Sequence, residues 1–113
     1  GRVLIARSLA QEAPLLIADE PTAGLDPAHQ IAAMESFSKA AGQGRGVLVS
    51  LHDLGLAARH CTRLIVLHNG AVVADDVPQV ALTTEIVKAV FGITAFSEVT
   101  EKGFVFQPLE VVS

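Results

Sequence analysis

The chain has 113 residues, of which half are apolar and 18% are charged, and its mean hydropathy is +0.47. This composition excludes a disordered chain, which needs few apolar groups and a high net charge, and no apolar run approaches the roughly 18 residues of a membrane span. The net charge of −4 argues against a general nucleic-acid surface, and the single cysteine, Cys61, excludes an internal disulfide framework.

The first predicted elements are a helix and a buried strand. Arg2–Glu12 carries apolar side chains at helical spacing, which predicts a helix that lacks an N-cap residue. Leu15–Ala18 is a short, continuous apolar run, typical of a strand covered on both faces in a parallel sheet. The run ends at two adjacent acids, Asp19 and Glu20.

A loop, a helix and a second strand follow. Proline and glycine mark Pro21–Pro27 as a loop. Within it, Asp26 can cap the helix predicted over residues 28–41, with proline in the first turn. Val47–Leu51 is a second strand of the buried type, and His52 stands at its carboxyl end.

The next segment predicts a short helix and a hairpin. Asp53 opens a helix that runs to about Cys61, and Leu64–Leu67 is a third apolar strand. The dipeptide at 69–70, Asn-Gly, is a strong hairpin signal, so Ala71–Ala74 is expected to return antiparallel.

The tail differs in character from the preceding residues. Pro78–Phe91 predicts one or two short helices, and Thr94–Thr100 and Phe104–Gln107 predict two strands joined as a hairpin. The alternation of strand and helix before this tail predicts an α/β fold with parallel core strands. The tail is expected to form a small α+β subdomain.

The acidic pair and the histidine are the candidate functional residues. Carboxylates at the carboxyl end of a parallel strand lie where open α/β sheets bind ligands. Asp19 and Glu20 are adjacent, so they point to opposite sides of an extended chain, and one can face a metal while the other faces a water. The alternative interpretation is a solvated acidic strand end, and His52 has the matching alternative of a structural strand-end histidine.

Four segments together resemble one family. LLIADEP resembles the Walker B motif of the nucleotide-binding domain of ATP-binding cassette (ABC) transporters, GLD its D-loop, and VLVSLHD its switch-histidine segment. GRVLIARSLA resembles the helix directly after the family's signature sequence. These motifs follow the family's order and cover residues 1–70, and their combination is far more specific than any one of them.

The resemblance implies a fold and a set of roles. Residues 1–76 would form the carboxyl-terminal part of a three-layer, P-loop NTPase-like core, and residues 77–113 a tail subdomain. Asp19 would hold Mg²⁺ through water, and Glu20 would be the general base for the water that attacks ATP. His52 would contact the γ-phosphate. The D-loop residues would lie at the interface with a second copy of the domain; they are Gly24, Leu25 and Asp26.

Two family motifs are missing from the chain. It contains no G-x-x-x-x-G-K-[ST] phosphate loop, and the signature stretch would lie just before Gly1. We therefore expect the carboxyl-terminal part of a larger domain, with the phosphate-loop half missing and with apolar surface meant to meet that half. The 113-residue chain alone is expected to lack appreciable ATPase activity.

The tail favours one branch of the family. Residues 77–92 and the following hairpin resemble the ATPase subunits of importers for iron-siderophore complexes, haem and cobalamin, with polar-amino-acid importers as the runner-up branch. This resemblance implies ATP and Mg²⁺ as cofactors. It also implies a homodimer bound to membrane permease subunits, without nucleic acid, on the cytoplasmic face of a bacterial membrane.

Two alternatives remain open from the sequence. One is a truncated, non-catalytic interaction module, because the phosphate loop is missing. The other is a non-transport ABC-type ATPase of DNA repair or chromosome organisation, although the chain has no heptad run and an acidic pI near 5.4.

Overall fold

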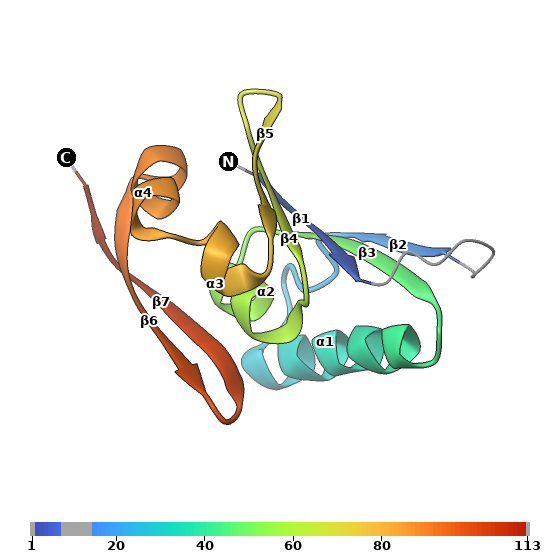
Figure 1. The fold of residues 1–113 in the computed structure, drawn as a ribbon. Coiled ribbons are helices and arrows are strands. Elements are labelled where there is room, and N and C mark those ends of the chain that lie inside the picture. The colour runs from blue at the N-terminus through green and yellow to red at the C-terminus, as the bar shows by residue number, and fades with distance from the viewer. Residues whose placement is uncertain (1, 8–14, 113) are drawn as a thin grey trace.

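A computed structural model describes residues 2–7 and 15–112, which form a five-stranded sheet, flanking helices and a separate hairpin (Figure 1). The sheet has the strand order β2-β3-β1-β4-β5. Its strands are β1 (Arg2–Arg7), β2 (Leu15–Asp19), β3 (Gly46–Leu51), β4 (Leu64–His68) and β5 (Ala71–Asp76).

The predicted parallel core is present, with one strand inserted into it. β2 and β3 pair in parallel, while β1 pairs antiparallel with both β3 and β4, so β2, β3 and β4 run in the same direction. β5 returns antiparallel to β4 through the predicted turn, where Asn69 and Gly70 have φ values of 51° and 77°. These positive values are what an Asn-Gly hairpin turn requires.

The helix predicted over Arg2–Glu12 is wrong for its first part. Arg2–Arg7 is a strand, and the remaining residues of that prediction lie outside the described residues. The backbone of this strand, β1, lies between β3 and β4, with Val3 opposite both Leu51 and Val66. Without this strand, β3 and β4 would each present an unpaired row of backbone donors and acceptors, so pairing outweighs the helical spacing of the apolar residues.

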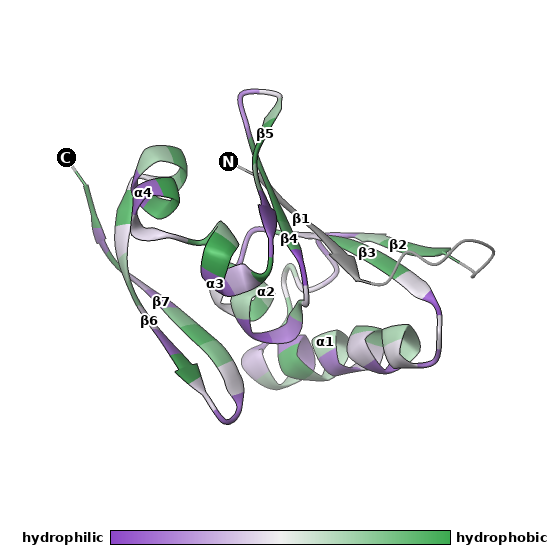
Figure 2. Ribbon diagram, viewed as in Figure 1, coloured by the Kyte–Doolittle hydropathy of each residue, from purple (hydrophilic) through white to green (hydrophobic). Residues whose placement is uncertain are grey.

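Helices α1 (Pro27–Gly42) and α2 (Leu54–His60) cover one face of the sheet (Figure 1). The side of β3 that carries Val47 and Val49 packs against Met34 of α1, and all three side chains are buried. β2 and β3 are mostly hydrophobic, whereas α1 mixes hydrophobic and hydrophilic residues (Figure 2). On the other side of β2, Leu15 and Ile17 are 52% and 65% exposed.

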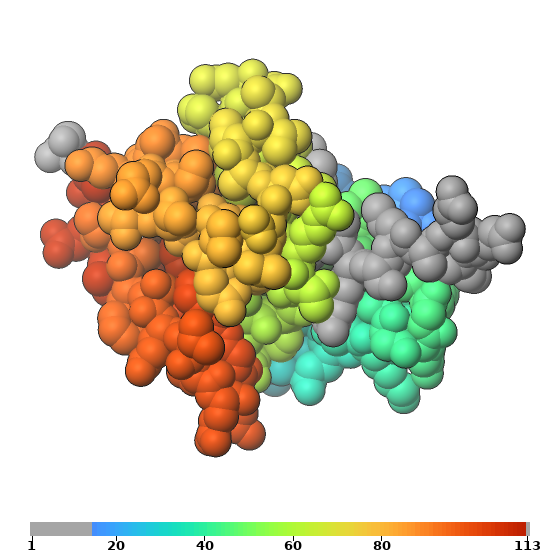
Figure 3. Space-filling view, in the orientation of Figure 1, coloured from blue at the N-terminus to red at the C-terminus, as the bar shows by residue number. Residues whose placement is uncertain are grey.

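The tail contains short helical turns and a two-stranded hairpin, as the sequence predicts. Its elements are α3 (Pro78–Ala81), α4 (Thr84–Ile86), the π-helical turn η1 (Val87–Phe91), β6 (Ile93–Thr100) and β7 (Gly103–Val111). Phe104 and Phe106 of β7 are buried, and β7 packs against α2. In the space-filling view the tail, orange to red, lies directly against the green and yellow residues that precede it (Figure 3). Among the described residues, none of the helices reaches the length and hydropathy that a membrane crossing requires.

Candidate functional site

The parallel pairing of β2 and β3 brings the predicted site residues together. Asp19 is the last residue of β2 and stands opposite Ser50 in the register of the pair. Parallel strands end at the same edge of a sheet, so the residues after Asp19 and after Leu51 lie side by side. Those residues are Glu20 and His52.

The predicted base and the predicted histidine are in direct contact. The Nε2 atom of His52 lies 2.5 Å from the Oε1 atom of Glu20. The side chain of Glu20 is 32% exposed and that of His52 is 65% exposed, so the pair stands at the surface with access to water. An imidazole and a carboxylate in hydrogen-bond contact can together orient a water molecule and accept its proton.

Ser50 connects the ends of the two strands. Its hydroxyl group donates a hydrogen bond to Oδ1 of Asp19. The backbone N–H of Glu20 donates to the Oγ atom of Ser50 at 3.0 Å and to the Ser50 carbonyl oxygen at 2.9 Å. The positions of both acidic residues are therefore fixed relative to β3.

The backbone of Glu20 adopts an uncommon conformation. Its φ of 46° lies in the left-handed region, which non-glycine residues seldom occupy and which costs of order 1–3 kcal/mol. The chain turns here: the carbonyl oxygen of Glu20 accepts a hydrogen bond from the Ala23 N–H at 3.1 Å. This turn ends β2 beside the carboxyl end of β3.

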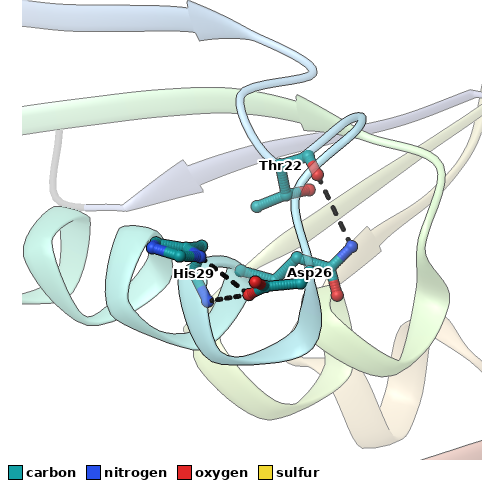
Figure 4. A network of polar contacts seen from close by, with 4 residues as sticks. Thr22, Asp26 and His29 are labelled. Carbon is teal, nitrogen blue, oxygen red and sulfur yellow. Dashed lines mark hydrogen bonds and ion pairs between the residues drawn. The ribbon is translucent and has the colours of Figure 1, made fainter.

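A hollow of about 130 Å³ lies beside the pair. Seven residues line it: Glu20, Thr22, Ala23, Gln30, Leu51, His52 and Asp53. Thr22 is buried, and its carbonyl oxygen accepts a hydrogen bond from the Gln30 side chain at 3.5 Å, which ties the turn to α1 (Figure 4). The hollow is large enough for a few waters or one phosphate group, and smaller than the 300–1,000 Å³ of typical small-molecule sites.

The predicted interface residues lie on the exposed loop before α1. Gly24 has a φ of 77°, and Gly24, Leu25 and Asp26 are all exposed. Asp26 is the N-cap of α1, as its sequence predicts: its Oδ1 atom accepts hydrogen bonds from the His29 N–H at 2.9 Å and from the His29 ring at 2.8 Å (Figure 4). These two hydrogen bonds hold the pKa of Asp26 below its usual value, and the bond from the His29 backbone has the larger effect.

Known proteins that resemble the chain act in import. No protein-family model matches it. The hemin import ATP-binding protein HmuV of Pseudomonas fluorescens is 48% identical over 97 residues, which cover 81% of this chain and 38% of HmuV. The cobalamin import ATP-binding protein BtuD of Halobacterium salinarum is 46% identical over 91 residues, which cover 80% of this chain and 23% of BtuD.

A solved structure agrees in fold. A structure described as an inward-facing metal-chelate type ABC transporter superposes with a TM-score of 0.70 at 23% identity, over 85% of this chain and 40% of that one. The chain is similar to the ATP-binding subunits of ABC importers. It spans less than two fifths of the length of HmuV and BtuD.

Asp19 is the described residue best placed to hold a divalent cation such as Mg²⁺. Mg²⁺ is commonly held by one or two carboxylates together with waters and substrate phosphates. Asp19 could supply such a carboxylate, oriented by Ser50, at the exposed end of β2. Within residues 2–7 and 15–112, no three acidic, histidine or cysteine side chains gather into a cation site of their own. An ion here would therefore depend on water and phosphate oxygens.

Sequence reasoning missed the two buried polar residues of the site, Ser50 and Thr22. A signal for Ser50 was available, because it is a polar residue inside the apolar strand Val47–Leu51. A buried hydroxyl needs a hydrogen-bond partner. Only the β2–β3 register identifies that partner as Asp19.

Proposed function

We propose that this chain carries the hydrolytic residues of an ATP-hydrolysing, energy-coupling subunit of a bacterial ABC importer. The observation that carries the proposal is the 2.5 Å contact between Glu20 and His52 at the ends of two parallel strands, next to Asp19. The names of the relatives support haem or cobalamin as the cargo. The likeness of the tail adds iron-siderophore complexes.

The proposed roles follow from the chemistry of phosphoryl transfer. Transfer of a phosphoryl group to water depends mainly on positioning and on stabilising charge, so a general base and a hydrogen-bond donor near the γ-phosphate are the groups required. Glu20 would accept the proton of the attacking water or orient that water. His52 would hold the base in line and contact the γ-phosphate. Asp19 would hold Mg²⁺ through water, and the bound ion would neutralise phosphate charge.

The proposed assembly places the site between two subunits. The exposed loop residues Gly24, Leu25 and Asp26 are available to a second copy of the domain. We assign residues 1–76 to the ATPase core and residues 77–113 to a tail subdomain. The subunit would lie on the cytoplasmic face of the membrane, bound to permease subunits.

The test is the substitution Glu20→Gln in the protein at the length of its relatives. Removing the base should lower kcat for ATP hydrolysis by a factor of about 10²–10⁴, while ATP binding is retained. The measurement is phosphate release in parallel with nucleotide retention on a filter. Glu101→Gln, the same change at the exposed tip of the β6–β7 hairpin, is the control and should leave kcat unchanged. Normal turnover in Glu20→Gln would remove Glu20 from this role.

The 113-residue chain alone provides a second test. Because it lacks a phosphate-loop motif, we expect it to show no appreciable ATPase activity. Turnover that disappears on Glu20→Gln would refute this expectation. Loss of ATP binding from the protein at the length of its relatives would instead favour the non-catalytic interaction module.

A further inference from the structure

Ser50 occupies a position whose chemistry goes beyond filling the sheet. It is 5% exposed, in a strand whose other residues are glycine, valine and leucine. Burying a hydroxyl in such surroundings is unfavourable unless the group is hydrogen-bonded. Here the hydroxyl both donates and accepts, and both partners are acidic residues of the proposed site.

The direction of each hydrogen bond is fixed by the partner. An N–H can only donate, so the backbone of Glu20 donates to Oγ of Ser50 at 3.0 Å. The single hydroxyl proton of Ser50 is then directed to the carboxylate of Asp19. Ser50 therefore sets the orientation of the Asp19 carboxylate and the backbone position of Glu20 at once.

The same contacts hold the turn at Glu20. The left-handed φ of 46° is maintained by bonds from the Glu20 N–H to the Ser50 carbonyl at 2.9 Å and to the Ser50 hydroxyl. Strained backbone of this kind persists only where its surroundings over-determine it. From this turn the Glu20 side chain reaches the ring of His52, which lies two residues after Ser50 and directly follows β3.

We propose that Ser50 is a positioning residue that couples the metal-side carboxylate of Asp19 to the Glu20–His52 pair. The proposal rests on the function proposed above and adds a residue to the same site. Hydrogen-bonding partners behind a ligand or base change metal affinity or activity by 10- to 100-fold when removed. Ser50 acts through Asp19 and Glu20.

The kinetic test uses the protein at the length of its relatives. Ser50→Ala removes only the hydroxyl, and we expect kcat for ATP hydrolysis to fall about tenfold or more while KM for ATP stays within about twofold. Ser50→Thr keeps a hydroxyl in a strand and should recover kcat to within about threefold of wild type. Wild-type kcat in Ser50→Ala, measured beside a Glu20→Gln variant that has lost turnover, would overturn the role of Ser50.

Two further readouts do not depend on turnover. Mn²⁺ affinity, measured by electron paramagnetic resonance with ADP bound to supply phosphate oxygens, should weaken about tenfold in Ser50→Ala and recover in Ser50→Thr. In ¹⁵N spectra, the His52 Nε2 resonance of Ser50→Ala should move toward that of Glu20→Gln. An unchanged Nε2 resonance and unchanged Mn²⁺ affinity in a folded Ser50→Ala would contradict the proposal.

The outcomes separate the two proposals. If the protein at the length of its relatives does not hydrolyse ATP, the proposed function fails, whatever the Ser50 variants show. If Glu20→Gln keeps normal turnover, only the proposed role of Glu20 fails. If Ser50→Thr unfolds or fails to recover activity, Ser50→Cys serves in its place, because it matches serine in shape and keeps a weaker donor. An intermediate kcat in Ser50→Cys supports positioning by a hydrogen bond, and a kcat equal to that of Ser50→Ala opposes it.

Discussion

The packing of the tail on α2 can be tested at Gly55, a position where the two elements lie close together. A Cβ atom added at this position would lie 3.2 Å from the Phe106 carbonyl oxygen and 3.3 Å from Oδ1 of Asp53. The carbonyl belongs to β7, whose backbone is paired with β6 and whose Phe106 side chain is buried. The hairpin would have to move by a few tenths of an ångström as a unit, because the carbonyl is backbone and Oδ1 of Asp53 is held by the Leu56 N–H as the N-cap of α2.

The expected magnitude follows from two opposing effects. Replacing glycine by alanine in a helix stabilises it by up to about 1 kcal/mol, and by less in the first turn. Overpacking of a well-packed contact costs about 1–3 kcal/mol. We therefore expect Gly55→Ala to lower the free energy of unfolding by about 1 kcal/mol.

Gly42→Ala is the matched control, and urea denaturation is the assay. Gly42 is the last residue of α1, and a Cβ atom there would have no neighbour within 4 Å. This variant should gain about 0.4–1 kcal/mol, so the two urea midpoints should differ by about 1 M. If Gly55→Ala is as stabilising as Gly42→Ala, the backbone of β7 lies farther from α2 than the 3.2 Å approach at Gly55 requires.

Two further predictions concern the core and a surface ion pair. Leu64 has no exposed surface, so Leu64→Ala should lower the free energy of unfolding by about 2–5 kcal/mol in urea denaturation. The loss should be smaller for Ile65→Ala, because the neighbouring Ile65 is only half-buried. Equal losses would contradict the assignment of Leu64 to the buried face of β4. Arg63 donates two hydrogen bonds to Asp75 at 2.6 and 2.7 Å, which lowers the pKa of Asp75 below 3.8. The stability from this pair is therefore present above pH 3.8 and is lost as the pH falls through the lowered value. The Tm advantage over Asp75→Asn should shrink in acid, and an advantage independent of pH would oppose this account.

Local signals were sufficient for most of the fold. Leu15–Ala18 and Val47–Leu51 are apolar runs too short for helices, and Asn69 with Gly70 admits few conformations other than a hairpin turn. The exception is Arg2–Arg7, whose apolar residues fit a helical face and a buried strand equally well. Its state depends on β3 and β4, which are far away in the sequence, so no local pattern decides it.

In the candidate site, too, some residues are predicted by local sequence signals and others depend on strand pairing. Asp19, Glu20 and His52 were predicted because each follows an apolar run, and parallel pairing then accounts for the observed contact between Glu20 and His52. The role of Ser50 depends on which residue of β2 stands opposite it, and the register that decides this comes from the β2–β3 pairing as a whole. The left-handed backbone of Glu20 carries no glycine or asparagine signal that sequence reasoning could use.

The position of β1 has a consequence for how the molecule assembles and how it resists force. β3 and β4 are near neighbours in the sequence, yet in the sheet they are joined only through β1, in which Val3 pairs with Leu51, 48 positions further along. The pairs β2–β3 and β4–β5 can each form from contacts between residues that are closer in the sequence. Adding β1 between them requires contacts between residues that are far apart in the sequence, and closing such long loops slows folding. Tension applied at Arg2 would pull on the middle of the sheet. The force would therefore be shared by the hydrogen bonds on both sides of β1, those to β3 and those to β4. A strand at the edge of the sheet would have hydrogen bonds on one side only to resist the same force.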